Sequence, residues 1–288
     1  MARRRSETVL VTRIAADASR RREPDELIVE EPMTIQLDGQ IVTTTMRTPG
    51  HDYELAAGFC LTEGVLGGAP VMGVRYCANG SAVSSEFNVV TVETGGKAPP
   101  FNPRLGLTSS SCGLCGSDGI DVLSERLAPI PHGAADDFDL DSFPDVCARV
   151  LAGQELFGRT GAVHAAAAFA SDGTILVTRE DVGRHNAVDK VIGRLLLDRR
   201  LPADAGGRPL GLFVSGRASF EMVQKAWAGG FAVLLSVSAP TALAVQTAQR
   251  ANVMLAGFVR GQRFNVYAPE RVAPRTPDAL NAQPRSHR

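Results

Sequence analysis

The sequence has few aromatic residues and cysteines, and almost no net charge. Of its 288 residues one is Trp, three are Tyr and five are Cys, and the formal net charge is -1. A net charge near zero produces no field that would draw the chain to nucleic acid or to a membrane surface, so neither is expected as a partner. No run of about 18 apolar residues occurs, so no membrane-spanning helix is predicted.

The cysteines also lack the pattern of a disulfide framework. Five is an odd number in a long chain, and only Cys112 and Cys115 are closely spaced. The first ten residues, MARRRSETVL, carry charge but are not followed by the apolar run of a secretory signal. This pattern is typical of a reducing compartment in which one cysteine pair has a chemical use, so the protein is expected in the cytoplasm.

What the chain does contain is an ordinary globular composition, 44% hydrophobic and 21% charged, in a length that can bury a large core. Residues 1–24 are rich in Arg and residues 271–288 mix Pro, Arg, Asn and Gln, so both ends are predicted to be flexible. Between them we expect a β-rich region over residues 25–130, which carries the cysteine pair, and an α/β ligand-binding domain over residues 131–270.

The β-rich region opens with a clear alternation. In PMTIQLDGQIVTT, Met33, Ile35 and Leu37 alternate with polar residues, Asp38-Gly39 supplies a tight turn, and apolar residues resume at Ile41 and Val42, which predicts a β-hairpin. A helix is expected next, with Asp52 as its N-cap. Residues 95–119 are dense in Gly, Pro, Ser and Asn, which places the cysteine pair on a long loop.

From about residue 138, apolar strands alternate with helices. A helix is predicted over residues 143–156, followed by two strands around an Asp172-Gly173 turn. LGLFVS and FAVLLSV have the pattern of buried strands, each followed by a helix, and VMLAGFV that of a last apolar strand. The predicted fold is an α/β layered sheet, at least partly parallel, with a smaller β-rich N-terminal region.

Arginines recur in the segments that follow these strands. Ligands of such sheets bind outside the carboxyl ends of the strands, and converging guanidinium groups suit phosphate or carboxylate. The residues concerned are Arg179, Arg184, Arg217, Arg260 and Arg263. The predicted ligand is a small molecule that bears phosphate. The alternative is that the arginines are solvated or form ion pairs with nearby carboxylates, those of Glu180, Asp181 and Glu221.

Three kinds of chemistry use a Cys-x-x-Cys pair. A structural zinc site needs a second ligand pair, and a deaminase-type zinc site needs His-x-Glu; the sequence has neither, so no metal site is predicted. A redox pair usually lies where a strand leads into a helix. A persulfide carrier needs a thiol on a mobile loop and a second thiol that can attack the persulfide and expel its outer sulfur. The residues alone leave the last two open.

Seven blocks of sequence form a more specific pattern between about residues 31 and 267. They are EPMTIQLDG, TMRTPGHDYELAAGF, SSSCGLCG, TREDVGRHNAVDKVIG, VSGRASFEMVQKA, VSAPTALAV and GFVRGQRFNVY. Together they resemble the formate dehydrogenase accessory sulfurtransferase family, FdhD. The resemblance implies a sulfurtransferase that takes sulfur from a cysteine desulfurase as a persulfide on Cys112, with Cys115 as its partner. The acceptor would be the molybdenum (or tungsten) bis(molybdopterin guanine dinucleotide) cofactor that formate dehydrogenase needs.

The resemblance further implies a homodimer and a cytidine deaminase-like fold for the larger domain. It assigns cofactor contact to the segment FVRGQR, which comprises Phe258, Val259, Arg260, Gly261, Gln262 and Arg263. Arg217, which follows a neighbouring strand, is expected to share this site, and GDP would act as a fragment analogue of the cofactor. The alternative function is a cofactor-binding chaperone whose cysteine pair is only regulatory.

Overall fold

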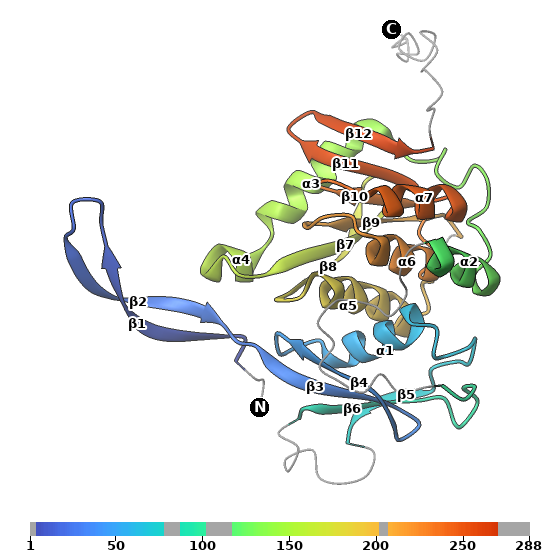
Figure 1. The fold of residues 1–288 in the computed structure, drawn as a ribbon, viewed down its shortest axis with the longest axis horizontal. Coiled ribbons are helices and arrows are strands. Elements are labelled where there is room, and N and C mark those ends of the chain that lie inside the picture. The colour runs from blue at the N-terminus through green and yellow to red at the C-terminus, as the bar shows by residue number, and fades with distance from the viewer. Residues whose placement is uncertain (1–3, 78–86, 102–116, 202–206, 270–288) are drawn as a thin grey trace, which may run out of the picture.

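The computed structural model describes residues 4–77, 87–101, 117–201 and 207–269. Figure 1 shows a large sheet with helices on its faces, a smaller sheet below it, and a two-stranded ribbon that extends to one side. The predicted α/β layered sheet with a smaller β-rich N-terminal region is confirmed. None of the helices in the described ranges is long and apolar enough to cross a membrane.

The larger sheet has the strand order β12–β11–β10–β9–β7–β8. Strands β9, β10 and β11 run parallel to one another, and β7, β8 and β12 pair antiparallel with their neighbours. The bounds are β7 (His164–Ala170), β8 (Ile175–Asp181), β9 (Leu210–Val214), β10 (Val233–Ser236), β11 (Met254–Arg260) and β12 (Arg263–Ala268). The prediction that VMLAGFV is the last strand is wrong, because the chain turns at Gly261 and returns as β12.

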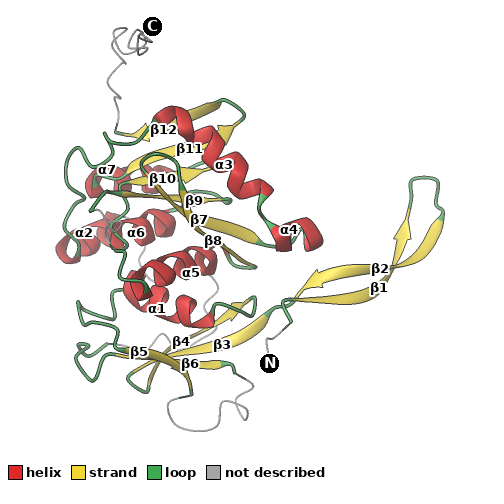
Figure 2. Ribbon diagram, turned by 180° about the vertical axis from the view of Figure 1, so that it is seen from behind, coloured by secondary structure: helices red, strands yellow, loops and turns green. Residues whose placement is uncertain are grey.

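Helices cover both faces of this sheet. Helices α5 (Arg184–Leu197), α6 (Phe220–Ala228) and α7 (Ala242–Ala251) lie on one face, and α3 (Phe143–Ala152) lies on the other (Figures 1 and 2). The predicted helix over 143–156 is divided, because α3 ends at Gly153 and α4 (Glu155–Thr160) begins anew. The carboxylate of Glu180 accepts hydrogen bonds from the first free backbone N–H groups of α4, which fixes the new start.

The smaller sheet has the order β4–β3–β6–β5 and is covered by α1 (Asp52–Thr62). Its strands are β3 (Glu31–Leu37), β4 (Gln40–Arg47), β5 (Gly73–Tyr76) and β6 (Val89–Glu93). The predicted hairpin turn is confirmed, with Asp38 and Gly39 both at positive φ. Asp52 is not the N-cap. His51 occupies that position, and the Asp52 carboxylate instead binds the Arg47 guanidinium at 3.0 Å.

The two layers meet where α1 crosses α5. A Cβ atom on Gly58 would lie 1.9 Å from the backbone oxygen of Asp189, and one on Gly193 would lie 1.7 Å from that of Glu54. Each helix backbone therefore fills the space that a side chain on the other would need. Helix α2 (Ser117–Arg126) packs against α7, and Leu123 belongs to the core of the larger sheet. The larger layer thus takes in residues before 131.

The N-terminal end differs from the prediction. Residues 1–24 were expected to be flexible, but β1 (Ser6–Ile14) and β2 (Arg20–Ile28) pair over nine residues each (Figures 1 and 2). The low content of large apolar groups suggested an unstructured end, yet Thr8, Val9, Val11 and Thr12 are β-branched and favour a strand. The predicted flexible tail over 271–288 lies outside the described residues.

Candidate functional site

The candidate site lies along the edge of the larger sheet where the parallel strands end. Three segments meet there: the loop after β9, the loop after β10, and a bulge near the end of β11. Ala218 forms a parallel bridge with Pro240, and the Phe258 N–H donates to the Ser238 carbonyl at 3.2 Å. The three segments are therefore held side by side, in the order of their strands.

Three of the predicted arginines are at this edge. Arg217 lies in the loop after β9, and Arg260 and Arg263 face each other across the turn between β11 and β12. All three are exposed, and none forms an ion pair with any residue that the structure describes. Their positive charges are available to an anionic ligand. No contact places Arg217 directly against the other two.

The segment from Phe258 to Arg263 contains side chains exposed to solvent and a buried side chain that packs beneath them. Phe258 is 42% exposed and lies at positive φ in the bulge, whereas Val259 is buried and supports the strand from inside. Gly261 at φ 55 makes the turn, with Gln262 exposed beside it. The side chains of this segment that can meet a ligand directly are therefore Phe258, Arg260, Gln262 and Arg263.

A second cationic group occupies the other end of the same edge. A Cβ atom on Gly216 would lie 3.4 Å from Arg184 Cδ and 3.6 Å from His164 Nδ1, so these residues surround the start of the β9 loop. Arg184 Nε and His185 Nε2 are buried and have no hydrogen-bond partner among the described residues. His185 Nε2 does lie 3.6 Å from Glu221 Oε2. A buried Arg184 N–H without an acceptor among the described residues suits an anion.

The sequence interpretation included Arg184 but missed the two histidines. Neither histidine is part of a His-x-Glu motif, and no other role was assigned to either from the sequence, whereas the antiparallel β7 brings His164 beside Asp181 and the start of α5. Burial, followed by the charges of Arg184 and His185, lowers the pKa of His164 from 6.5. Its ring is therefore neutral at pH 7, when Arg184 carries a charge that no described carboxylate pairs.

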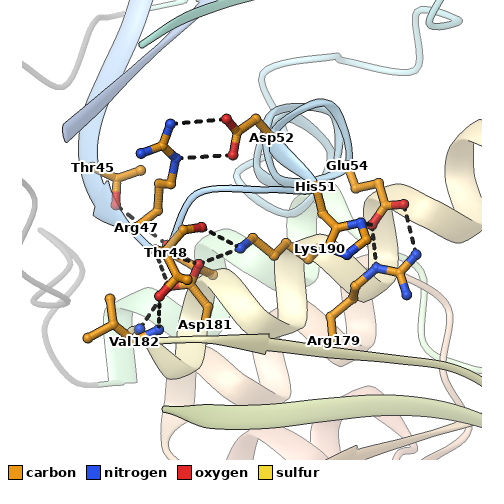
Figure 3. Close-up of polar contacts among 12 residues, drawn as sticks. Thr45, Arg47, Thr48, His51, Asp52, Glu54, Arg179, Asp181, Val182 and Lys190 are labelled. Atoms are coloured by element: carbon orange, nitrogen blue, oxygen red, sulfur yellow. Dashed lines mark hydrogen bonds and ion pairs between the residues drawn. The ribbon is translucent and has the colours of Figure 1, made fainter. Parts of the chain in front are cut away.

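Arg179 does not belong to the site, and its inclusion is corrected. Its guanidinium binds the Glu54 carboxylate of α1 at 2.5 and 2.8 Å (Figure 3). Burial alone would raise the pKa of Glu54, but hydrogen bonds from Arg179 and His51 outweigh it and lower the pKa to about 2. The proposed alternative, an ion pair with a carboxylate, is right for Arg179, although the partner is none of the three that were named.

Asp181 fastens the site to the smaller layer. Its carboxylate is fully buried and lies 2.6 Å from Lys190 Nζ, and it accepts hydrogen bonds from the N–H groups of Thr48 and Gly183 (Figure 3). Lys190 Nζ also donates to the Thr48 carbonyl at 2.9 Å. These contacts hold the first turn of α5, which carries the second cationic group, against the loop between β4 and α1.

The predicted catalytic residues Cys112 and Cys115 lie outside the described residues. The described chain stops at Phe101 and resumes at Ser117. Phe101 lines a pocket of about 430 Å³ together with Phe59, Glu63 and Arg126. Two other cysteines, Cys60 and Cys147, are buried, and burial raises the pKa of both thiols, which makes them poor nucleophiles. No group of three potential metal ligands occurs in the described ranges.

Comparison with known proteins identifies the relatives of this chain. The model of the FdhD/NarQ family matches residues 28–273. The sulfur carrier protein FdhD of Nocardia farcinica is 47% identical over 251 residues, which cover 86% of this chain and 88% of that protein. The protein of the same name from Mycobacterium tuberculosis is 46% identical over 255 residues, which cover 85% of this chain and 90% of that protein.

Solved structures agree with these relatives. A crystal structure described as that of a formate dehydrogenase accessory protein from Desulfotalea psychrophila has a TM-score of 0.69 and 25% identity. The alignment covers 93% of this chain and 99% of that chain. A guanine deaminase from Nitrosomonas europaea also aligns with 54% of this chain, but its TM-score is only 0.29. With a family match over most of its length and relatives at 46% and 47% identity, the chain belongs to the FdhD/NarQ family of sulfur carrier proteins.

Proposed function

We propose that this protein is a cytoplasmic sulfurtransferase that carries sulfur as a persulfide from a cysteine desulfurase to the molybdenum bis(molybdopterin guanine dinucleotide) cofactor. Formate dehydrogenase would then use the sulfurated cofactor. The observation that supports this most directly is the cationic edge of the larger sheet. There, Arg217, Arg260 and Arg263 have no ion pair among the described residues, in a chain whose relatives are sulfur carriers.

The edge suits the chemistry of this substrate. The cofactor carries two pyrophosphates and two guanines, so it needs several cations and surfaces on which a base can stack. Exposed guanidinium groups bind phosphate oxygens through paired hydrogen bonds, and the exposed ring of Phe258 offers a face for a guanine. The buried Arg184 Nε could take a further phosphate oxygen, because it has no hydrogen-bond acceptor in the part of the chain that the structure describes.

The sulfur step is assigned to Cys112 and Cys115. The Cys112 thiolate attacks the outer sulfur of the desulfurase persulfide, forms a new S–S bond and releases the desulfurase thiolate. When sulfur is delivered, the Cys115 thiolate attacks the inner sulfur of the Cys112 persulfide. The outer sulfur leaves as sulfide, a disulfide remains, and a cellular dithiol must reduce it before the next cycle.

The test is the mass of the intact protein after treatment with a cysteine desulfurase and cysteine. The wild type should gain the mass of one sulfur atom, and Cys112→Ala should gain none. Cys115→Ala should gain the sulfur and retain it longer, because the attacking thiol is absent. Cys77→Ala, which removes a half-buried cysteine far from the pair in sequence, should load like the wild type.

Two outcomes would contradict the proposal. If the wild type gains no sulfur but still binds GDP, the alternative function applies, that of a cofactor-binding chaperone with a regulatory cysteine pair. If Cys112→Ala loads normally, or fully activates formate dehydrogenase in cells, the persulfide is carried by another residue.

A further inference from the structure

A carboxylate also lies at the cationic edge of the larger sheet, in the first turn of α6. It belongs to Glu221, whose side chain is 19% exposed. The Ser219 hydroxyl donates to its Oε2 at 2.7 Å, and His185 Nε2 lies 3.6 Å from the same oxygen. Ser219 begins the helix directly after the loop that carries Arg217. The carboxylate is therefore held between the β9 loop and the start of α5, within the candidate site.

Two other carboxylates close to this edge serve the fold instead. Glu180 accepts the backbone N–H groups that begin α4, and Asp181 is fully buried against Lys190. Glu221 differs, because its hydrogen bond and its histidine contact lie within the site itself. A carboxylate repels phosphate, so its place among the cations suits a different part of the ligand.

The part of a nucleotide that a carboxylate can bind is an N–H edge. Guanine presents two neighbouring donors, N1–H and the 2-amino group, which the two oxygens of one carboxylate can accept together. Its O6 lies beside them and accepts a hydrogen bond, and the His185 ring beside Glu221 can donate one. Adenine has no 2-amino group and carries an acceptor at N1, so it cannot form the same contacts.

The other groups of the edge do not distinguish one base from another. Every base has a π-face, so the exposed ring of Phe258 can stack on any of them. Phosphate contacts carry no information about the base. Arg260 is on β11, two strands from β9, which is about 10 Å across the sheet. An extended nucleotide bridges that distance, so a phosphate at Arg260 and a base at Glu221 can belong to one ligand.

We infer that Glu221 makes this site select guanine. Its carboxylate accepts N1–H and the 2-amino group of the base, and His185 donates to O6. Ser219 is a positioning residue, because its hydroxyl holds the carboxylate in place. This role of Glu221 rests on the proposed function, which supplies a guanine nucleotide as the ligand. The resemblance to FdhD assigns cofactor contact to residues 258–263 and names no residue that recognises the base.

Glu221 also has a purely structural explanation. A carboxylate in the first turn of a helix stabilises the helix dipole, and the hydrogen bond from Ser219 fits that role. Loss of the carboxylate would then disturb the β9 loop and weaken the binding of every nucleotide by the same factor. The two explanations therefore differ in whether the loss of affinity depends on the base.

The test is calorimetric titration of the wild type and Glu221→Gln with GDP and with inosine diphosphate (IDP). IDP is GDP without the 2-amino group, so it keeps the phosphates, the ribose and N1–H. The wild type should bind GDP about tenfold more tightly than IDP, which is the loss of one hydrogen bond to a charged group. In Glu221→Gln this preference should be largely lost, because the amide NH2 opposes an N–H donor and the remaining oxygen is uncharged.

A third ligand turns the same substitution into a gain. Xanthosine diphosphate (XDP) has an oxygen where GDP has the 2-amino group, and the Glu221 carboxylate repels that oxygen. The amide NH2 of Glu221→Gln can donate to it, so the variant should bind XDP more tightly than the wild type does. Ser219→Ala releases the carboxylate without removing it, so it should reduce the preference for GDP over IDP by a smaller factor.

The control is Asp145→Asn, which removes an exposed carboxylate from the first turn of α3. Helix α3 begins beside Gly173 in the turn between β7 and β8, at the opposite end of the sheet from the candidate site. Asp145→Asn should bind all three nucleotides like the wild type. Circular dichroism and the melting temperature show whether each variant is folded.

Four results would overturn the role of Glu221. A wild type that binds GDP and IDP equally does not recognise the 2-amino group, although the proposed function still stands. A folded Glu221→Gln that weakens GDP and IDP by one factor and gains nothing for XDP gives Glu221 a structural role. If Glu221→Gln does not fold, an unchanged preference for GDP in Ser219→Ala is the contrary result. A wild type that binds none of the three nucleotides contradicts the cofactor binding of the proposed function as well.

Discussion

Cationic side chains at the junction of the two layers differ from those at the carboxyl edge of the larger sheet. At the junction, Arg47, Lys190 and Lys225 are buried, and each contacts a carboxylate at 2.6 to 3.0 Å. At the edge, Arg217 and Arg263 are exposed and meet no carboxylate among the described residues.

This difference separates charges that maintain the fold from charges that can bind a ligand. A buried charge that loses its partner destabilises a protein by several kcal/mol, so the junction residues are fixed in their pairs. An exposed arginine without a partner has no such role, so an anion can bind it at little cost to the fold. Four changes can break or sharpen the comparison, taken in order of their expected effect on the free energy of unfolding.

The largest effect is expected for Lys225→Met. Lys225 Nζ donates to Asp189 at 2.9 Å, to Thr62 at 2.9 Å and to Glu63 at 3.2 Å, and all of these contacts are buried or nearly so. Without Lys225, Asp189 is a buried charge with no cation beside it and only the Thr62 hydroxyl as a described side-chain donor, so unfolding should become easier by about 3–5 kcal/mol. Urea denaturation followed by far-UV circular dichroism measures the loss.

The pH dependence of that loss has a definite sign. Burial raises the pKa of Asp189, and Lys225 is the main group that opposes the rise. In Lys225→Met the folded protein should therefore bind a proton at Asp189 more readily than the unfolded chain. The difference in the free energy of unfolding between the wild type and Lys225→Met should therefore become smaller as the pH falls from 7 towards 5. The double variant Lys225→Met/Asp189→Leu should recover much of the stability, and a loss below about 1 kcal/mol in the single variant would contradict the pairing argument.

The next effect is expected for Gly193→Ala, at the crossing of α1 and α5. The new Cβ would lie 1.7 Å from the backbone oxygen of Glu54, so the helices must move apart. Unfolding should become easier by about 3 kcal/mol. Gly158→Ala in α4 is the matched control, since nothing lies within 4 Å of its Cβ position. It should stabilise by about 0.5–1 kcal/mol. If Gly193→Ala and Gly158→Ala changed the free energy of unfolding by the same amount, the close approach of α1 and α5 would not be required for stability.

A smaller effect is expected for Glu54→Gln, which breaks the pair with Arg179. The pKa of Glu54 is lowered from 4.5 to about 2, so the ionised carboxylate stabilises the folded state above pH 4.5. At pH 7 the variant should be less stable by about 1–2 kcal/mol, after allowance for solvent screening. The difference should narrow as the pH falls from 4.5 towards 2, where the wild type also protonates Glu54. A constant difference over this range would exclude the pair as its source.

The pattern of the sequence was sufficient for most of the central elements, but it missed β1, β2 and β12 and did not show which charged residues are partners. Alternation and turn residues predicted the β3–β4 hairpin and strands β7 to β11 of the larger sheet, because those signals are local. Arg179 lies near the end of β8 and Arg217 follows β9, and nothing nearby in the sequence separates the roles of the two arginines. The partner of Arg179, Glu54, lies 125 residues away, on a helix of the other layer. Contacts between layers could not be derived from periodicity.

The same limit explains the other differences. Periodicity shows that α1 and α5 are helices, but the need for Gly58 and Gly193 arises only where the two backbones meet. His164 and His185 are 21 positions apart in the sequence, and antiparallel pairing of β7 with β8 brings them to one edge. The cysteine pair, in contrast, is a prediction from sequence alone, since its chemistry depends on a spacing of three residues, and it lies outside the described residues.

The smallest change in stability, and the largest in binding, is expected at the edge. Arg217→Ala, Arg260→Ala and Arg263→Ala should each change the free energy of unfolding by less than about 0.5 kcal/mol, since these arginines are exposed and pair with no carboxylate that the structure describes. Each should weaken GDP by about 10- to 150-fold, which corresponds to the loss of one charge-assisted hydrogen bond of about 1.5–3 kcal/mol. Calorimetric titration measures the affinity, and urea denaturation the stability.

Arg179→Ala reverses this expectation and serves as the control. It removes a guanidinium of the same size and charge, but one that binds Glu54 at the junction. It should lower stability and leave the affinity for GDP unchanged. Sulfur loading should be normal in all four variants, because Cys112 lies on a different segment from every one of these arginines. The contrary outcome is that the three edge variants bind GDP like the wild type while Arg179→Ala binds it more weakly. The presence or absence of an ion pair would then not separate arginines that maintain the fold from arginines that bind a ligand. The ligand would bind at the junction of the layers instead.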